Sequence, residues 1–482
     1  MMNARQHPKS LAPSTELERL FALQRDAFAQ ERFPPLAVRK RRVERVLEIV
    51  TKHEKALCAA VAQDFGHRSH HETRLAELFF VAAEARTALN HLREWMRTRR
   101  VSTPLHLLPA SSRILRQPLG VVGIISPWNY PVQLGLAPAI GALAAGNRVL
   151  LKPSEVTPAT SALLENLVSR LFDEDEFAVV LGDAAVGHAF AMQRWDHLFF
   201  TGSTTVGRLV ALAAADNLVP VTLELGGKSP AIFDHDTDLA VAVPRLVSGK
   251  LLNAGQTCIA PCYAMVPEAR VDEFVAAVGD AVKSMYPTLA GNPDYTAVVN
   301  ARHYQRLKGL LDDARAKGAR ILPLNPAKEA LPASARKIAP TLILDVTDDM
   351  RVMQEEIFGP LLPVEAVADL DDAIARVNAR PHPLALYYFG DDDARRERVL
   401  RETMSGGVTV NDTLLHFANE ALPFGGVGPS GQGAYHGEGS FVLFSNEKPV
   451  FTQARLAATR LLNPPYGALF DSVLSVLNRL KG

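Results

Sequence analysis

Short apolar runs that alternate with helical stretches constrain the fold of this chain more than any other feature. Four runs open the pattern, at Val121–Ser126, Arg148–Leu151, Ala178–Leu181 and His197–Thr201, and a small-residue helix is expected at Leu136–Ala145. Such runs are typical of strands buried on both faces, and their alternation with helices indicates a mostly parallel sheet. We therefore predict a doubly wound α/β sheet, with ligand sites beyond the carboxyl ends of its strands.

A second alternating block begins near Val221 and predicts a second α/β domain. Its strand candidates are Pro230–Phe233, Tyr263–Val266, Thr341–Leu344, Leu384–Phe389 and Gly407–Val410. Helical stretches between them are Val271–Met285 and Ala301–Lys317. A chain of 482 residues is too long for one core, so two or three domains are expected.

Both ends of the chain are expected to be helical. Apolar residues recur at helical spacing from Val43 to Val61, and Gly66 is a suitable stop. After Pro464 and Pro465 the same spacing returns at Leu469, Phe470, Val473, Leu474, Leu477 and Leu480. This predicts an amphipathic helix of about four turns that packs on its own protein or on a partner subunit. A membrane surface is the alternative contact, but Arg479 and Lys481 are fewer basic residues than such helices carry.

One charge-free stretch, from Gln117 to Asn147, is long enough to span a bilayer. Pro127, Pro131 and Pro138 interrupt it. Because prolines break helices, a buried strand, loop and helix is favoured over a membrane span.

Charge and cysteine content exclude several partners. Lys plus Arg equals Asp plus Glu at 52 each, so no nucleic acid is expected, and the basic run Arg39–Arg42 is predicted to be a solvated helix face.

Three cysteines suggest no disulfide framework, and Met1–Glu16 has no apolar signal core, so a cytoplasmic protein is predicted. His67, His70 and His71 lack further convergent ligands, so no metal is expected.

Three residues carry the candidate chemistry. Cys258 taken alone is more often a small buried hydrophobe than a nucleophile. Burial beside the apolar strand Val219–Leu225 would raise the pKa of Glu224 into the range of a general base, unless Glu224 is a surface carboxylate paired with Lys228. Asn129 follows a strand, where its amide could donate to an oxyanion or serve only in a turn.

Two glycine patterns look like nucleotide-binding motifs. Gly426–Gly431 matches the dinucleotide fingerprint literally, but prolines stand where a strand end and a helix start are required. Gly202–Gly207 has the glycine spacing of a P-loop, but Arg208 replaces the required lysine. Gly202–Gly207 still leads from a strand into a helix, whose free N–H groups suit a pyrophosphate. An ordinary helix capped by Ser203 explains it equally well.

Seven segments in order resemble the aldehyde dehydrogenase superfamily, over about residues 20–455. They are Pro127–Asn129, Lys152–Glu155, Phe200–Ser203, Leu223–Lys228, Asn253–Cys258, Glu356–Pro360 and Pro423–Gly428. Leu223–Lys228 resembles the family's glutamate signature and Asn253–Cys258 its cysteine signature. The Asn129–Pro131 loop, Val410–Asp412 and Gly433–Gly437 look most like the class 3 branch. The chain length and the tail at Tyr466 resemble the bacterial coniferyl aldehyde dehydrogenases within that branch.

The resemblance implies an aldehyde dehydrogenase-like α/β fold. N-terminal helices and a Rossmann-type NAD(P)-binding domain would occupy residues 1–222, and a catalytic domain residues 223–430. Residues 431–462 would return to the first domain, and residues 463–482 would form the tail. Strands near 101–118, including Arg113–Gln117, and near Lys448–Gln453 would form a small bridging sheet that joins two subunits in a homodimer.

The resemblance also implies a role for each candidate residue. Cys258 would form a thioester with a small-molecule aldehyde, Asn129 and the Cys258 N–H would hold the oxyanion, and Glu224 would activate water. NAD is the implied cofactor, and NADP is an alternative. By similarity, Lys152 and Glu155 face the adenosine ribose, and Gly202 and Ser203 the pyrophosphate. The remaining cofactor-binding residues implied are Trp128, Gly207, Leu225, Glu356 and Phe358.

The substrate is predicted less directly. Tyr130, Asn411, His416 and Phe417 are the candidates for a substrate funnel, and the C-terminal tail could gate it. A coniferyl-type aromatic aldehyde is the first expectation, and a medium- or long-chain aliphatic aldehyde is the second. CoA-acylating relatives usually lack the glutamate, and non-catalytic relatives tend to lose the cysteine or the asparagine. Both kinds of relative are therefore disfavoured. Cys262 would share a face with Cys258 if the segment were helical.

Overall fold

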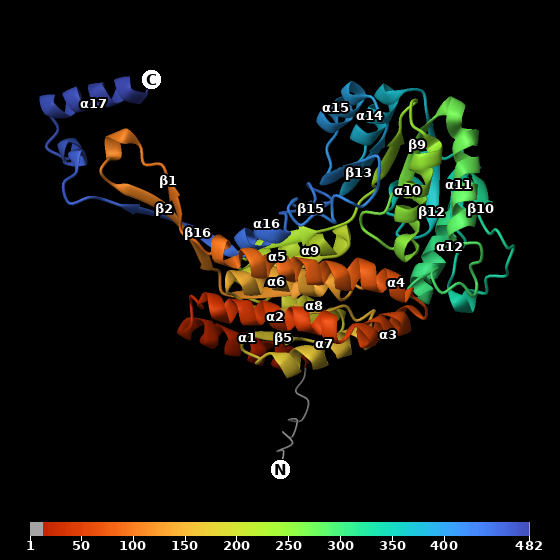
Figure 1. Ribbon diagram of the computed structural model, residues 1–482, viewed down its shortest axis with the longest axis horizontal. Helices are drawn as coiled ribbons and strands as arrows, with labels where there is room; N and C mark the ends of the chain where they lie inside the picture. Colours follow the sequence, from red (N-terminus) through yellow and green to blue (C-terminus); the bar gives the residue numbers. More distant parts are fainter. Residues whose placement is uncertain (1–12, 482) are drawn as a thin grey trace, which may run out of the picture.

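The computed structural model describes residues 13–481. The predicted absence of a signal core at Met1–Glu16 therefore falls mostly on residues 1–12, outside the described part. Three sheets organise the chain. Figure 1 shows a lower body, an upper body at the right, and an arm that projects to the left.

The lower body contains a six-stranded sheet with the order β15-β7-β6-β3-β4-β5. Its strands are β3 Val121–Ile125, β4 Arg148–Lys152, β5 Phe177–Val179, β6 His197–Thr201, β7 Val221–Glu224 and β15 Gly431–Gln432. Only β15 runs antiparallel to its neighbour. The four strands predicted from the first apolar runs are confirmed to within two residues at each end.

Helices cover both faces of this sheet, as a doubly wound fold requires. One face carries α2 Leu36–Lys52, α3 Glu54–Phe65, α5 Phe80–Trp95, α6 Gln133–Ala145 and α7 Pro158–Leu171. The other face carries α1 Pro13–Gln30, α8 Ala184–Ala191 and α9 Thr204–Ala215. Two short helical elements, α4 His70–Thr73 and the π-helix η1 Arg74–Phe79, join α3 to α5. Gly66 ends α3 with a φ of 73°, as predicted.

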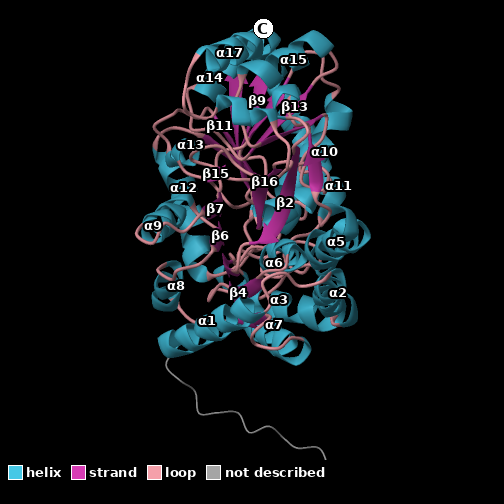
Figure 2. Cartoon of the chain, turned by 90° about the vertical axis from the view of Figure 1, so that its left-hand side faces the viewer, coloured by secondary structure: helices cyan, strands magenta, loops and turns pink. Residues whose placement is uncertain are grey.

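The upper body contains a seven-stranded sheet with the order β10-β11-β12-β9-β8-β13-β14. Its strands are β8 Pro230–Phe233, β9 Tyr263–Pro267, β10 Arg320–Pro323, β11 Thr341–Leu344, β12 Leu361–Val367, β13 Ala385–Phe389 and β14 Gly407–Val410. Its main helices are α10 Leu239–Leu251, α11 Val271–Met285, α12 Ala301–Ala316, α13 Arg351–Gln354, α14 Leu370–Asn378 and α15 Asp393–Glu402. The chain changes sheet between β7 and β8, beside the predicted boundary at residue 222. The domain limits themselves stay a prediction. Figure 2 shows the strands along the middle of the molecule, surrounded by helices.

Two strands of the upper sheet were not predicted. In β12, Pro363 and Glu365 interrupt the apolar run, although the strand is almost wholly buried. The edge strand β10 is short and largely exposed, with Arg320 at its start. Neither strand has the continuous apolar pattern on which the prediction depended.

The arm is the predicted bridging sheet. It contains β1 Arg99–Val101, β2 Ser111–Pro118 and β16 Ser445–Thr452, all antiparallel. The helix α16 Gly437–Leu443 precedes β16, and the predicted amphipathic helix α17 Ala468–Lys481 lies beyond the arm (Figure 1). The side chains of Leu480 and Lys481 lie outside the described part.

The basic run in α2 differs from the prediction. Arg39 and Arg42 are only 1% and 2% exposed. Arg39 donates to main-chain carbonyls at the end of α6, and Arg42 pairs with Glu176 at 3.0 Å and with Glu31 at 3.3 Å. The prediction of a solvated face was wrong for these two residues, because a positive cluster in the sequence does not reveal the acceptors that other segments bring to it.

The charge-free stretch forms β3, a loop and α6, as predicted. No described helix combines the length and the apolar character that crossing a bilayer requires.

Candidate active site

Cys258 lies in a tight turn between α10 and β9. Three consecutive residues before it, Asn253, Ala254 and Gly255, have φ values of 55°, 51° and 75°. At Gly255 a Cβ atom would overlap the carbonyl of Gly359, so only glycine allows this approach. The turn holds Cys258 half-buried in the wall of a cavity.

Glu224 ends β7 beside Cys258. It is 1% exposed, and neither carboxyl oxygen has a hydrogen bond with normal geometry among the described residues. Burial raises the pKa of Glu224 to about 8, and contact with the Cys258 thiol offsets part of this rise. Burial and the nearby carboxylates of Glu224 and Glu356 raise the pKa of Cys258 well above its ordinary value. A thiol beside a carboxyl whose pKa lies near neutral pH has the chemistry that a nucleophile with a general base requires.

Asn129 reaches the same turn from the loop after β3. It is 3% exposed, and its Nδ2 donates to the carbonyl of Gln256 at 3.2 Å. The Asn129 carbonyl accepts from Asn253 Nδ2 at 3.0 Å and from Arg68 Nη1 at 2.8 Å. Hydrogen bonds therefore join the loop of Asn129 to the turn of Cys258. The two segments are far apart in the sequence, so the sequence alone does not show that they are close in space.

The predicted pyrophosphate seat has the geometry of a helix start. Ser203 caps α9 by accepting from the N–H of Val206, and Gly202 N donates to the carbonyl of Glu224 at 3.0 Å. A side chain at Gly207 would overlap Leu225, so this glycine lets α9 pack closely on the end of β7. The segment is compatible with an ordinary capped helix and with a pyrophosphate-binding site. A capped helix start leaves its other N–H groups free to bind an anion.

The other predicted cofactor residues lie in two groups. In the first, Lys152 at the end of β4 is buried and donates to Glu155 Oε2 at 2.8 Å. Burial acts to raise the pKa of Glu155, but the hydrogen bond and the charge of Lys152, together with a main-chain hydrogen bond, outweigh burial, and the net shift is downward. In the second, the rings of Trp128 and Phe358 pack edge to face at 5.3 Å.

Glu356 lines a cavity of about 590 Å³ together with Thr204, Gly226, Gly227 and Lys228. A Cβ atom at Gly226 would overlap the Glu356 carboxylate. Burial raises the pKa of Glu356 to about 7. This volume suits a small-molecule site, and the glycines leave room for a ligand where side chains would fill it. The residues present therefore fit a dinucleotide.

A second cavity, of about 430 Å³, has Cys258 in its wall and is mainly apolar. Its wall includes Leu75, Phe79, Phe80, Tyr130, Leu134, Leu252, Cys258, Leu415, Phe417 and Phe424. Aromatic rings pack against each other along it, with Phe80 and Phe417 at 5.4 Å and Phe417 and Phe424 at 4.9 Å. Two of the four predicted funnel residues, Tyr130 and Phe417, lie in this wall.

The other two funnel residues do not. Asn411 lines a separate cavity of about 200 Å³, where its side chain bonds to the main chain of Gly390. His416 is 9% exposed and bonds to Thr409 Oγ1 at 2.8 Å. Placing these two in the funnel was wrong, because the loop after β14 turns them toward its own supporting strands. The tail does not gate the funnel of its own chain either, since α17 lies beyond the arm (Figure 1).

Lys228, Cys262 and Gly426–Gly431 lie near the site, and their contacts are structural. Lys228 does not pair with Glu224, because its Nζ donates to the carbonyls of Val352 and Glu355. Cys258 and Cys262 do not share a helix face, because the segment is a turn and Cys262 packs into a different core cluster. The fingerprint-like Gly426–Gly431 is a tight turn whose Ser430 carbonyl accepts from Leu225 N, so it supports the end of β7.

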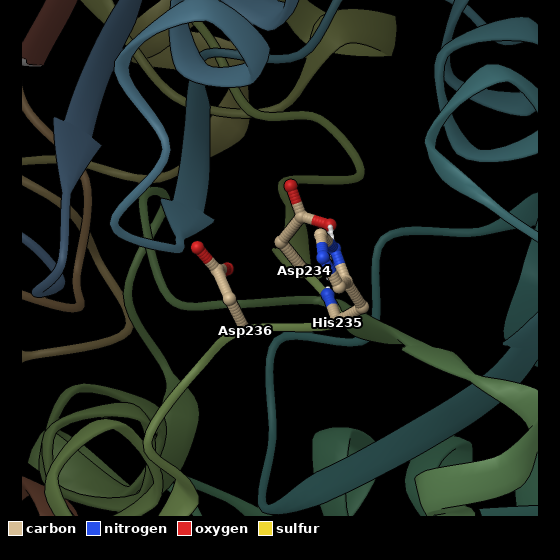
Figure 3. Close-up of side chains that lie close together, drawn as sticks. All are labelled: Asp234, His235 and Asp236. Carbon is tan, nitrogen blue, oxygen red and sulfur yellow. Dashed lines mark hydrogen bonds and ion pairs between the residues drawn. The ribbon is translucent and has the colours of Figure 1, made fainter.

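One group of described side chains has the proximity of a metal site, Asp234, His235 and Asp236 (Figure 3). Arg395 donates two hydrogen bonds of 2.7 Å to Asp234. Asp236 accepts from the main chain at Asp391 and Asp392. Because these oxygens have protein partners, the group acts as an ion pair and a loop cap. The expectation of no metal stays a prediction.

Comparison with known proteins agrees with this site. The chain matches the aldehyde dehydrogenase family over residues 9–450. It is 51% identical over 452 residues to a probable coniferyl aldehyde dehydrogenase of Pseudomonas aeruginosa, with 94% of each chain covered. Its fold is similar to that of Staphylococcus aureus AldH in the substrate-bound state, with a TM-score of 0.91, 38% identity, and 96% of this chain and 99% of that chain covered.

A Mycobacterium tuberculosis aldehyde dehydrogenase complexed with NAD⁺ is also similar, with a TM-score of 0.81, 28% identity, and 92% and 91% coverage. The sequence resemblance is therefore confirmed, and it extends to the coniferyl aldehyde dehydrogenases that the chain length and the tail at Tyr466 indicated. The chain belongs to the aldehyde dehydrogenase family and is an NAD(P)-dependent aldehyde-oxidising enzyme.

Proposed function

We propose that Cys258 is the nucleophile, Glu224 the general base, and Asn129 with the Cys258 N–H the oxyanion donors. The observation that carries this proposal is the contact of Cys258 with the buried Glu224 in a turn to which Asn129 is also bonded. Cys258 lines the apolar cavity, and the glycine-lined cavity at Glu356 is separate from it. An aldehyde and a cofactor would therefore occupy different cavities.

The proposed reaction divides into two halves. The Cys258 thiol loses its proton to solvent, and the thiolate attacks the aldehyde carbon. The carbonyl oxygen becomes an oxyanion that Asn129 and the Cys258 N–H hold. NAD, when bound, supplies the hydride acceptor. Loss of hydride leaves the acyl group on sulfur as a thioester. Glu224 then takes a proton from water as the water attacks the thioester carbon. The bond between this carbon and sulfur breaks, which releases the carboxylic acid and restores the Cys258 thiolate.

We propose a coniferyl-type aromatic aldehyde as the substrate, with medium- or long-chain aliphatic aldehydes as the second class. The name of the Pseudomonas aeruginosa relative and the paired rings of Phe80, Phe417 and Phe424 support this choice, since aromatic rings favour each other beyond area burial. The test is the absorbance of reduced nicotinamide with a panel of aldehydes. A higher kcat/KM for aromatic propenals supports the proposal, and a rate that requires CoA contradicts the hydrolytic half.

Glu155 is proposed to favour NAD over NADP. Its half-exposed carboxylate beside Lys152 can accept the free 2′-hydroxyl of NAD and repels a 2′-phosphate. We expect Glu155→Gln to raise KM for NAD about tenfold, the effect of one lost charged hydrogen bond, and to lower KM for NADP. Steady-state kinetics with both cofactors measures this, with Glu165→Gln on α7 as the control. Equal changes for NAD and NADP would refute the assignment.

We also propose a cytoplasmic homodimer joined through the arm. The three described cysteines are free, which suits a reducing compartment. Large apolar side chains are exposed on and around the arm and on α17, namely Val101, Leu105, Leu108, Phe451, Leu469, Leu474 and Val476, as expected of a surface that another subunit covers. Contact of α17 with a membrane surface is less well supported. Sedimentation should give two chains per particle, and a monomer at micromolar concentration would exclude the dimer.

A further inference from the structure

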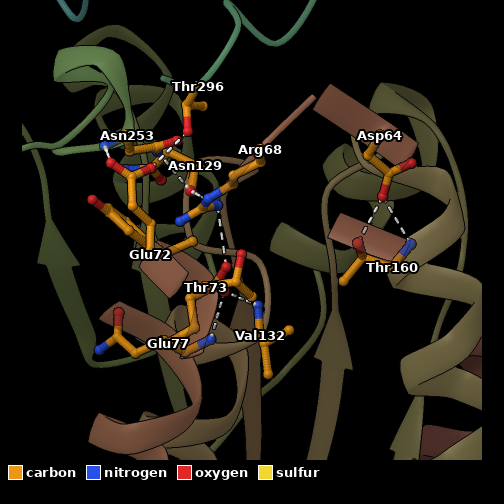
Figure 4. A network of polar contacts seen from close by, with 12 residues as sticks. Asp64, Arg68, Glu72, Thr73, Glu77, Asn129, Val132, Thr160, Asn253 and Thr296 are labelled. Atoms are coloured by element: carbon orange, nitrogen blue, oxygen red, sulfur yellow. Dashed lines mark hydrogen bonds and ion pairs between the residues drawn. The ribbon is translucent and has the colours of Figure 1, made fainter. Parts of the chain in front are cut away.

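A buried network of charged side chains lies next to Asn129 (Figure 4). These side chains take no part in the proposed reaction. Its centre is an ion pair of 3.1 Å between Arg68 and Glu77, whose side chains are both 0% exposed. Two further features confine Arg68, since its guanidinium lies over the ring of Phe65 at 5.0 Å and over that of Tyr130 at 4.8 Å. Burying a charged pair is costly, so its position beside the active site calls for an explanation.

The pair is bonded to the main chain at Asn129 and again three and four residues after it. Arg68 Nη1 donates to the Asn129 carbonyl at 2.8 Å. Glu77 Oε2 accepts from the N–H groups of Val132 at 2.7 Å and Gln133 at 3.2 Å. These two N–H groups open α6, which has no cap from its own Val132 side chain. The loop is thus fixed at Asn129 and just after it, where the amide must keep its direction.

The same short segment also holds the cysteine turn. Glu72 Oε1 accepts from the N–H of Asn253 at 3.1 Å, and its other oxygen accepts from Thr296 Oγ1 at 2.6 Å. Residues 68–77 therefore bond to both segments that build the proposed oxyanion site. They touch neither Lys152 nor Glu155 by any of the hydrogen bonds of the described residues.

We propose that Arg68 and Glu77 are positioning residues for aldehyde oxidation, whose buried ion pair fixes the main chain around Asn129 so that its amide stays at the Cys258 turn. This inference rests on the proposed role of Asn129. A shift of about 1 Å in a reacting group can cost about a hundredfold in rate. Loss of the pair should therefore lower kcat while leaving cofactor affinity unchanged.

The chain offers a matched control in Asp64. Its carboxylate accepts from the N–H groups of Ala159 and Thr160 at 2.9 and 2.8 Å and so caps α7, just as Glu77 caps α6 (Figure 4). The helix α7 carries none of the proposed catalytic residues. Asp64→Asn should therefore lower the unfolding midpoint and keep kcat within twofold.

The test compares Arg68→Met/Glu77→Gln, which removes both charges together, with Arg68→Lys, Asp64→Asn and Asn129→Ala. For each variant, kcat per NAD-binding site, the Kd of NAD and the unfolding midpoint are measured. Arg68→Met/Glu77→Gln should lower kcat about ten- to hundredfold with the Kd of NAD within twofold. Arg68→Lys keeps the charge but not the fork that reaches Asn129, so its kcat should be intermediate. If the double variant does not fold, Arg68→Lys still tests the inference.

The decisive comparison repeats the double change in the Asn129→Ala background. If Arg68 and Glu77 act only through Asn129, the further loss in kcat there should be under twofold. The inference is overturned if the pair costs the same factor in both backgrounds, if kcat of the double variant stays within twofold of the native protein, or if Asp64→Asn loses as much. If Asn129→Ala itself keeps full kcat, the oxyanion assignment fails first and this inference fails with it.

Discussion

Replacing Cys258 by alanine is expected to lower kcat for aldehyde oxidation by at least about four orders of magnitude, because no thioester can form without the sulfur. Cofactor binding should survive, since Cys258 lies in the wall of the apolar cavity and the residues proposed for NAD lie in other segments. The rate of reduced-nicotinamide formation and the Kd of NAD, measured on the same preparation, separate the two effects.

The control is Cys58→Ala, which removes a buried thiol of α3 that lines neither of the two cavities. It should lower the unfolding midpoint slightly and leave kcat within twofold. Comparable losses in the two variants would mean that Cys258 is a packing residue, which is the common role of a lone buried cysteine.

Replacing Glu224 by glutamine is expected to lower the steady-state kcat by about 10²–10⁴ while leaving a first burst of reduced cofactor. The pKa of Glu224 is raised to about 8 by burial, so below that pH the carboxyl is mostly protonated and cannot accept a proton from water. The steady-state rate of the native protein should therefore rise from pH 6 to pH 9, and this rise should disappear in Glu224→Gln. Stopped-flow absorbance separates the burst from the steady state.

Glu84 gives a second buried carboxyl for comparison. It is 5% exposed, and burial raises its pKa to about 7, but its Oε1 accepts a hydrogen bond from the N–H of Gly437. Glu84→Gln should keep the alkaline rise in rate. A Glu224→Gln variant that keeps this rise, or that forms no burst, would assign the base to another group or show that Glu224 acts before thioester formation.

Much of the site was predictable because its residues lie at ends of strands that the apolar pattern reveals. Glu224 ends β7, Lys152 ends β4, and Asn129 follows β3. In a parallel sheet those ends meet at one edge, so residues far apart in the sequence converge. Sequence alone could not place Asn411 and His416, because the direction of a loop after a strand depends on its own contacts, such as the bonds from Asn411 to Gly390.

The supporting network was not predictable for a related reason. Arg68 lies in the loop after α3, and Glu72 and Glu77 lie in the short helical elements that follow it. Most charged residues at such positions face solvent. Only the fold brings Asn129, Asn253 and the start of α6 to them. The same holds for Arg39 and Arg42, which are buried by acceptors from distant segments. The structure is therefore most informative about the buried charged side chains, because the sequence does not show which distant segments supply their partners.

The most direct test of the account is the intact mass of Glu224→Gln after one turnover with NAD and an aromatic propenal. We expect one reduced cofactor per subunit and a mass increase equal to the aldehyde less two hydrogens, located on the peptide that contains Cys258. Reduced cofactor without a mass increase, or an acyl group on another residue, would contradict thioester formation on Cys258.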